Sequence, residues 1–331
     1  MFRKIRKLVW LVLLLALGAV VATVCLIYSR RAENQDHVAQ VDGELKEEDR
    51  YFRVLVSGVD RTSGLSDVLM LVCIDREMDE AWVMQLPRDT YAAYTDRSYK
   101  KLNGAPQTLG SMEQTCRFLS DALGVEIDRY VRLSPDVLRD AVDAVGGVEI
   151  ELDRTMYYND PAQGLSIYLK KGKQMLNGEQ AEQLVRYRWG YARGDLDRLD
   201  VQKQFLSSFV RTAREKLSLS LAVRLASSLW GEVDTNLKLS ELPMLVGEMM
   251  ELDNESIFFV TAPGSEAIAK SGASYYALSA PSMEKLLCEH FGGEAGGFDR
   301  DGVFLNRQNF DFEKIYQSEL AYFASSVADS K

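Results

Sequence analysis

Histidine is nearly absent from this sequence: His37 and His290 are the two histidines among 331 residues. A zinc hydrolase or a Ser–His–Asp enzyme needs imidazole for metal ligation or proton transfer, so the composition argues against both classes. Positive charge is also outnumbered, because 39 lysines and arginines face 49 acidic residues and leave a formal net charge of −10. Binding to nucleic-acid phosphates requires a basic surface. We therefore expect no nucleic-acid partner.

Cysteine pairs and the common phosphate motifs are missing too. Cys73, Cys116 and Cys288 are scattered with no CxxC, and their odd number prevents complete pairing among the three. Each lies in an apolar segment, which favours buried thiols over catalytic nucleophiles. The sequence has no GxxxxGK[ST] loop, no GxGxxG after a strand and no HExxH. Any chemistry on phosphate must therefore use other residues.

Charge is absent from Leu8 to Ser29, a run of 22 residues. About 20 apolar residues cross a bilayer as a helix, and the run is long for a secretory signal or a core helix. Four basic residues precede it and two follow, which places the N-terminus in the cytoplasm. Without the four N-terminal positive charges, the remainder carries a net charge of −14. The prediction is a single-pass membrane protein with an acidic extracellular domain.

The chain organisation follows from this span. We expect a cytoplasmic segment at 1–7, a transmembrane helix at 8–29 and a polar stalk at 30–50. A single mixed α/β domain, with α+β character, should occupy 51–292, and a C-terminal tail 293–331. Its central mixed sheet should be flanked by helices. Strands are expected at 52–60, 67–75, 81–86, 128–133, 148–152, 256–262 and 275–278, with the second and third forming a hairpin. Helices are expected at 109–124, from Ser134-Pro135, at 179–188 and 195–216, through most of 218–252 and at 281–291.

Polar residues concentrate where the first three strands begin or end. Asp60-Arg61 ends the first strand, Ser66-Asp67 opens the second, and 87–90 (PRDT) closes the third. Strand ends are where α/β sheets usually bind ligands. Two carboxylates on adjacent strands, Asp60 and Asp67, suit a hard cation such as Mg²⁺ that also contacts substrate phosphate. The alternative is that each acid caps a turn or pairs with an arginine.

Arginine gathers in a second segment. Arg186, Arg188, Arg193 and Arg198 lie within 13 residues around a helix break, and the spacing of Arg198 and Gln202 places both on one helix face. Arginine forks match phosphate oxygens, and a helix N-terminus favours an anion. A solvated helix face decorated with ion pairs is the alternative. Inside an acidic domain, we favour a site for an anionic ligand.

These motifs together resemble the LytR–CpsA–Psr family of cell-wall glycopolymer transferases. The resemblance is carried by GVDR…SD, LPRDT, KLNGA at 101–105 and ARGDLDRLDVQKQF, in that order and after a membrane anchor, and it is strongest over about 52–216. It implies a Mg²⁺-dependent phosphotransferase in a Gram-positive-type cell envelope. Its donor would be a glycopolymer, such as teichoic acid or capsule, on undecaprenyl pyrophosphate, and its acceptor a peptidoglycan hydroxyl. Lipid bilayer, donor and peptidoglycan would be its partners.

The resemblance also implies roles for individual residues. Asp60 and Asp67 correspond to the metal ligands, and Arg88, Asp89 and Arg198 are the catalytic candidates, with Asp89 assisting deprotonation of the acceptor. Leu65 and Val201 depart from the family pattern, because arginine is common at both positions; Arg61 or Arg193 could substitute. The pyrophosphate-binding candidates are Arg61, Arg88, Lys101, Asn103, Arg186, Arg188, Arg193, Arg198 and Gln202.

The chemistry fits these residue types. Attack of a hydroxyl on a pyrophosphate needs positioning, a divalent ion and arginines more than it needs a covalent nucleophile. The prenyl chain needs an apolar slot between sheet and helices. Two alternatives stay open: a hydrolase of the same lipid pyrophosphates, and a non-catalytic protein that binds lipid pyrophosphate or wall polymer.

Overall fold

The computed structural model describes residues 50–59, 64–94, 100–160, 165–191, 195–269, 272–304 and 322–324, with the backbone alone for Asp195 and 322–324. The expected cytoplasmic segment, the membrane span and all of the stalk except Arg50 lie outside these ranges. No helix within the ranges combines the length and apolar character that crossing a membrane requires.

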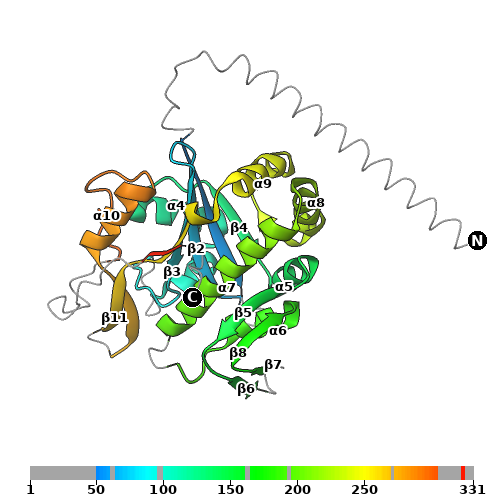
Figure 1. Cartoon of the computed structure of the whole chain (residues 1–331). Coiled ribbons are helices and arrows are strands. Elements are labelled where there is room, and N and C mark those ends of the chain that lie inside the picture. The colour runs from blue at the N-terminus through cyan, green and yellow to red at the C-terminus, as the bar shows by residue number, and fades with distance from the viewer. Residues whose placement is uncertain are drawn as a thin grey trace, which may run out of the picture. The chain divides into compact units, whose positions relative to one another are not determined.

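A mixed sheet forms the centre of the described part of the chain (Figure 1), as the sequence pattern predicts. Its seven strands lie in the order β13-β10-β3-β2-β1-β4-β9. The β1–β4 and β3–β10 pairs are parallel, and the other neighbouring pairs are antiparallel. The strands are β1 (Tyr51–Val59), β2 (Ser66–Asp75), β3 (Glu80–Leu86), β4 (Arg129–Leu133), β9 (Asp234–Thr235), β10 (Ile257–Thr261) and β13 (Tyr322–Ala324).

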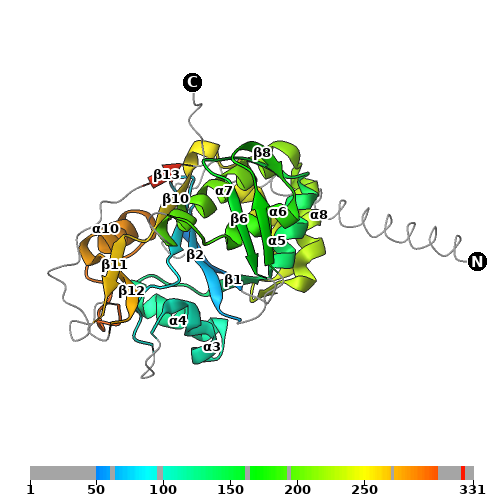
Figure 2. The ribbon, with the colours of Figure 1, turned by 90° about the horizontal axis from the view of Figure 1, so that it is seen from below.

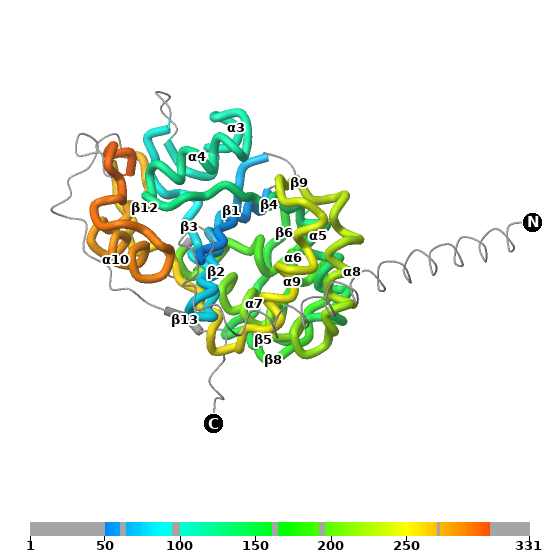
Figure 3. Tube along the Cα trace, turned by 90° about the horizontal axis from the view of Figure 1, so that it is seen from above, coloured from blue at the N-terminus to red at the C-terminus, as the bar shows by residue number. Residues whose placement is uncertain are grey.

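Helices cover both faces of this sheet. Figures 2 and 3 show α3 and α4 on one side and α5 to α9 on the other. The helices are α3 (Ala105–Leu109), α4 (Met112–Leu123), α5 (Pro135–Ala144), α6 (Gly178–Arg186), α7 (Asp195–Lys216), α8 (Leu219–Leu229), α9 (Leu242–Glu251) and α10 (Ala280–His290), with short 3-10 turns at Leu102–Gly104, Trp230–Glu232, Leu239–Glu241 and Asn254–Ser256.

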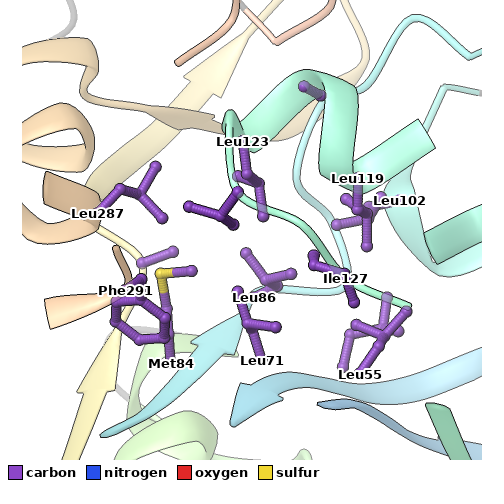
Figure 4. Close-up of a cluster of buried hydrophobic side chains, with 14 of the residues drawn as sticks. Leu55, Leu71, Met84, Leu86, Leu102, Leu119, Leu123, Ile127, Leu287 and Phe291 are labelled. Carbon is purple, nitrogen blue, oxygen red and sulfur yellow. The ribbon is translucent and has the colours of Figure 1, made fainter. Parts of the chain in front are cut away.

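The layers follow from the alternation of side chains along each strand. On β2, Leu69 and Leu71 belong to a core shared with α4 and α10, whereas Met70 and Ile74 belong to a core shared with α7 and α9. Figure 4 shows the first of these cores, in which Leu71 lies among side chains from the sheet and from α4 and α10. Because both faces are buried, β2 reads in the sequence as a nearly continuous apolar run.

Within the described ranges, three further pairs of strands lie outside the central sheet: β5 (Val148–Leu152) with β8 (Gly172–Leu176), β6 (Met156–Asp160) with β7 (Leu165–Leu169), and β11 (Gly264–Ile268) with β12 (Ser274–Leu278). The first two pairs bury a third core against α5, α6 and α7. The sequence patterns predict β5 and β12 but not the other four strands.

Local capping explains where the site-bearing helices begin. The Ser134 hydroxyl accepts a hydrogen bond from the Val137 backbone N–H, and Pro135 occupies the first turn of α5. Asn177 and Gln180 form a reciprocal capping box at the start of α6. The helix ends at Arg186, because the next residue, Tyr187, adopts an extended backbone conformation with φ −66° and ψ 132°.

Two of the three described cysteines have buried thiols, as the sequence predicts. Cys73 and Cys116 are buried, and burial raises the pKa of each thiol to about 12. Cys288 on α10 is only half-buried, so the prediction of a buried thiol is wrong there. That position lies on the less covered side of α10, whose buried residues are Met283, Leu286 and Leu287.

Residues after α10 also contribute to the structure. Phe304 is fully buried, and Phe298 packs against the same core as α4 and α10. At the edge of the central sheet, the backbone of β13 pairs with β10.

The core in Figure 4 gives a stability prediction. Leu71 is fully buried between the sheet and two helices, so Leu71→Ala should lower the free energy of unfolding by about 3 kcal/mol through lost contacts and a residual cavity. Chemical denaturation followed by circular dichroism measures this. Met78→Ala, in the exposed β2–β3 turn, is the control and should change stability by about 0.5 kcal/mol or less. Equal effects of the two substitutions would contradict this account of the core.

Candidate functional site

Asp67 lies at the centre of the candidate site. It is the second residue of β2, next to the point where Val59 at the end of β1 pairs with Ser66. Its Oδ1 accepts from Arg88 Nη1 at 3.2 Å and lies 2.6 Å from Arg188 Nη2. One carboxylate thus brings together two arginines that are 100 residues apart in the sequence.

The PRDT and KLNGA motifs form one structural unit. The Thr90 backbone N–H bonds to the Pro87 carbonyl at 2.9 Å, which turns the chain directly after β3. The Leu102 N–H then donates to the Thr90 carbonyl and the Asn103 N–H to the Arg88 carbonyl, at 2.9 and 3.1 Å. Asn103 and Thr90 are buried by this contact. These hydrogen bonds fix the backbone from Pro87 to Thr90, which includes Arg88, against the KLNGA segment.

Asp89 lies between two cations. Its Oδ1 is 3.1 Å from Lys101 Nζ and 3.9 Å from Arg88 Nε. This geometry suits a carboxylate that orients Arg88 and Lys101, and its pairing with Arg88 matches the alternative that a strand-end acid pairs with an arginine. Its role as a proton acceptor stays a prediction.

A second carboxylate, Glu182, holds Arg186. Both residues lie on α6 four positions apart, and Glu182 Oε1 accepts from Arg186 Nη1 at 3.0 Å. Glu182 Oε2 lies 3.2 Å from Arg139 Nε on α5, and Arg139 in turn pairs with Asp136. Glu182 is buried, so these bonds offset the cost of removing its charge from water.

Arg198 and Gln202 lie one turn apart on α7, and both side chains are almost fully buried, Arg198 at 1% exposure. Gln202 donates to the Val185 carbonyl at 3.0 Å and accepts from Gln85 Nε2 at 2.8 Å. This amide therefore links α7 to α6 and to strand β3. Arg198 is a charged side chain held inside the fold, an uncommon position for arginine.

An apolar cavity of about 140 Å³ lies beside these groups, between the sheet and α5, α6 and α7. Its walls come from Val56 and Val68 of the sheet, Leu138 of α5 and Phe205 of α7, among others. Five polar residues also line it: Asp67, Ser134, Glu182, Arg186 and Gln202. The cavity lies where the sequence suggests a slot for a prenyl chain, and it combines apolar walls with charged groups.

The structure brings most of the predicted site residues into one region. Asp67 contacts Arg88 and Arg188 directly, and it lines the cavity with Arg186 and Gln202. Lys101 and Asn103 join through their contacts with Asp89 and Arg88. Three predicted site residues lie outside the described ranges: Asp60, Arg61 and Arg193.

One departure from the family pattern has a structural explanation. Val201 packs against the apolar core shared by α6, α7 and the β5–β8 pair. An arginine there would need a different environment, so the valine is consistent with local packing. For Leu65 the structure offers no comparable explanation.

Sequence reasoning missed three residues that support the site. Glu182 could have been found from its i, i+4 spacing to Arg186 on a predicted helix. Arg139 and Gln85 carried no such signal, because their partners Glu182 and Gln202 lie on other elements. Glu182 contacts Arg186 and Gln85 contacts Gln202, both predicted to bind the ligand, whereas Arg139 acts through Glu182.

Comparison with known proteins agrees with the residue pattern. The model of the LytR–CpsA–Psr family matches residues 22–291. The chain belongs to the LytR–CpsA–Psr family. The match covers every motif that carries the resemblance and each residue of the candidate site.

Among relatives in the LytR–CpsA–Psr family is TagV of Bacillus subtilis, named as a polyisoprenyl-teichoic acid–peptidoglycan teichoic acid transferase. It is 27% identical over 252 residues, which span 72% of this chain and 64% of TagV. A TagU of the same functional name from Oceanobacillus iheyensis is 27% identical over 82% of this chain and 84% of its own length. The crystal structure of B. subtilis TagV superposes with a TM-score of 0.62, at 26% identity, over 76% of this chain and all of that chain.

The Glu182 bridge gives a prediction about stability. Glu182→Gln should lower the free energy of unfolding by about 2 kcal/mol, because two arginines lose a charged acceptor. Urea unfolding of the full-length protein in detergent measures this. Glu179→Gln is the matched control, since Glu179 is exposed on the same helix and should have a small effect. Identical urea midpoints for the Glu182 variant and the unsubstituted protein would exclude Glu182 as a structural link.

Proposed function

We propose that this protein is a phosphotransferase that moves a glycopolymer from an undecaprenyl-pyrophosphate carrier to a hydroxyl of peptidoglycan. The observation that carries the proposal is the position of Arg88, Arg186 and Arg188 around two carboxylates beside an apolar cavity. A lipid pyrophosphate is a concentrated anion attached to an apolar chain, so its two parts match the two parts of this region. The names of TagV and TagU support the same reaction class.

In this reaction the acceptor hydroxyl oxygen attacks the phosphorus that carries the glycopolymer. A new P–O bond forms to the acceptor, the bond to the bridging oxygen breaks, and undecaprenyl phosphate leaves. Negative charge spreads over the phosphoryl oxygens in the transition state. Arg88, Arg186 and Arg188 would bind those oxygens, because preorganised guanidinium groups stabilise developing charge without reorganising.

The proton of the acceptor hydroxyl needs a base near the arginines. Asp89 is the candidate, although its carboxylate also pairs with Lys101. Lys101 and Asp89 together would hold Arg88 in position while the substrate binds. Arg198, the third catalytic candidate, is held inside the fold one turn from Gln202, which lines the cavity.

The donor set around Asp67 fits Mg²⁺ held jointly by protein and substrate. Among the described residues no three acidic, histidine or cysteine side chains gather into a metal site. Mg²⁺ commonly uses one or two carboxylates, keeps several waters and binds substrate phosphates, so Asp67 can supply a protein ligand beside the arginines. When bound, the ion would neutralise pyrophosphate charge. Asp60 is the second proposed ligand.

The proposal includes a location. A lipid-linked donor and a peptidoglycan acceptor meet at the outer surface of the cytoplasmic membrane. A single span at 8–29, with the domain outside the cell, would keep the site close to the donor.

Arg88→Ala tests the proposal. It should slow release of undecaprenyl phosphate from a lipid-pyrophosphate-linked donor by about 100-fold or more, the usual effect of removing one group that stabilises the transition state. Product analysis with and without peptidoglycan fragments provides the measurement. Arg117→Ala is the matched control, because Arg117 is an exposed arginine on α4, and it should retain full activity.

The outcomes of this assay separate the alternatives. Transfer that requires the acceptor supports the phosphotransferase. Phosphate release that ignores the acceptor would identify a hydrolase, and binding of the donor without turnover would identify a binding protein. Full activity of Arg88→Ala would contradict the assignment of the site.

Asp67→Asn tests the metal proposal. Loss of the negative ligand should raise the Mg²⁺ concentration for half-maximal activity by about tenfold or more. Calorimetric titration of Mg²⁺ in the presence of pyrophosphate gives a readout independent of turnover. Asp79→Asn, in the β2–β3 turn, is the control. Unchanged Mg²⁺ affinity in the Asp67 variant would remove Asp67 from the metal site.

A further inference from the structure

An exposed tryptophan lies beside the arginine cluster. Trp189 follows Arg188 directly and is 68% exposed. Trp82, by contrast, is buried in the core and Trp230 is half-buried. An exposed indole next to a ligand-binding residue is a common feature of recognition surfaces.

The segment that carries Trp189 is fixed on both sides. Tyr187 is buried and contacts the ring of Tyr191 edge-to-face at 5.3 Å. Arg154 donates to the Gly190 carbonyl at 3.1 Å, and Gly190 adopts a φ of +74° that favours glycine. The exposure of the indole is therefore built into the fold.

Trp189 forms a near-parallel pair with Tyr158 of β6. Their ring centroids are 6.2 Å apart with an interplanar angle of 29°. The Tyr158 hydroxyl donates to Asp160 Oδ2 at 3.2 Å. Burial and the Asp160 carboxylate raise the pKa of Tyr158, and the Arg188 guanidinium opposes the rise. The aromatic pair is thus within electrostatic reach of the arginine that contacts Asp67.

We propose that Trp189, Tyr158 and Asp160 form a subsite for a pyranose ring next to the phosphate-binding arginines. The C–H groups on one face of a pyranose carry partial positive charge and pack on the electron-rich face of an indole or phenol ring. The ring hydroxyls need polar partners, which Asp160 and the Tyr158 hydroxyl offer. The inference rests on the proposed phosphotransfer, and the sugar comes either from the donor, attached to the transferred phosphate, or from the acceptor glycan.

The β6–β7 hairpin also carries a second pair of aromatic side chains, which lies outside the proposed subsite. Tyr157 and Tyr168 pair across β6 and β7, 65% and 57% exposed, with an edge-to-face angle of 78°. Neighbouring residues of a strand point to opposite faces, so Tyr157 and Tyr158 lie on opposite faces of the hairpin. Tyr157 therefore offers a matched control: an exposed aromatic residue on the same strand but outside the proposed subsite.

Binding measurements on the full-length protein test the subsite. The probes are undecaprenyl pyrophosphate, the same lipid carrying N-acetylglucosamine, and N-acetylchitotetraose as a phosphate-free glycan. Trp189→Ala should lose roughly tenfold in affinity for a sugar-containing probe, the scale of one aromatic stacking contact. Trp189→Phe should restore most of it, and Tyr157→Ala should bind like the unsubstituted protein. Affinity for the bare lipid should be the same in all variants.

The pattern of loss identifies the source of the sugar. If the subsite serves the donor, Trp189→Ala removes the gain that N-acetylglucosamine adds to the lipid; if it serves the acceptor, the substitution weakens chitotetraose binding instead. The proposal is overturned if neither changes, or if Trp189→Ala weakens only binding to vesicles of anionic lipid. Failure of the unsubstituted protein to bind the bare lipid would contradict the proposed function, while chitotetraose binding would still report on the subsite.

Discussion

Several arginines can lie together beside an apolar cavity only because carboxylates lie between them. Asp67 separates Arg88 from Arg188, and Glu182 separates Arg139 from Arg186. Without these acids, like charges in a partly dehydrated region would repel one another and destabilise the fold. The carboxylates also fix the direction of each guanidinium group. On the proposed function, these carboxylates would occupy the positions that the negatively charged pyrophosphate takes when the substrate binds.

This arrangement has a consequence for the substrate. On the proposed function, an arriving pyrophosphate competes with Asp67 for Arg88 and Arg188, so part of the binding energy is spent on displacing an internal ion pair. A cation at Asp67 would remove that competition, because the carboxylate would then bind the metal and leave both arginines to the phosphate oxygens. Glu182 differs: it is buried and shared by two arginines on neighbouring helices, which suits a permanent support.

Much of the fold and of the site could be predicted because the signals are local. Continuous apolar runs indicated β1, β2 and β3, and Ser134-Pro135 marked the start of α5. The positions of Asp67 and Arg88 at strand ends are enough to predict both as residues of the site. The strands between 156 and 176 and the edge strand β13 were missed, since these short segments depend on packing against α6 or β10. The contact of Arg139 with Glu182 was equally hidden, because it joins two helices whose packing the sequence does not specify.

The chemical order of the proposed substrate matches the order of surfaces around Asp67. Prenyl carbon, pyrophosphate and sugar follow one another along the lipid-linked donor. In the protein, the apolar cavity borders Asp67, Asp67 contacts Arg88 and Arg188, and Arg188 precedes Trp189, which stacks on Tyr158. Each of these groups is joined to the next by a side-chain contact or by the backbone, so a shift of one group would also shift the group that follows it. On the proposed function, Arg188 would link the two surfaces, because its side chain contacts Asp67 beside the apolar cavity and its backbone continues into Trp189.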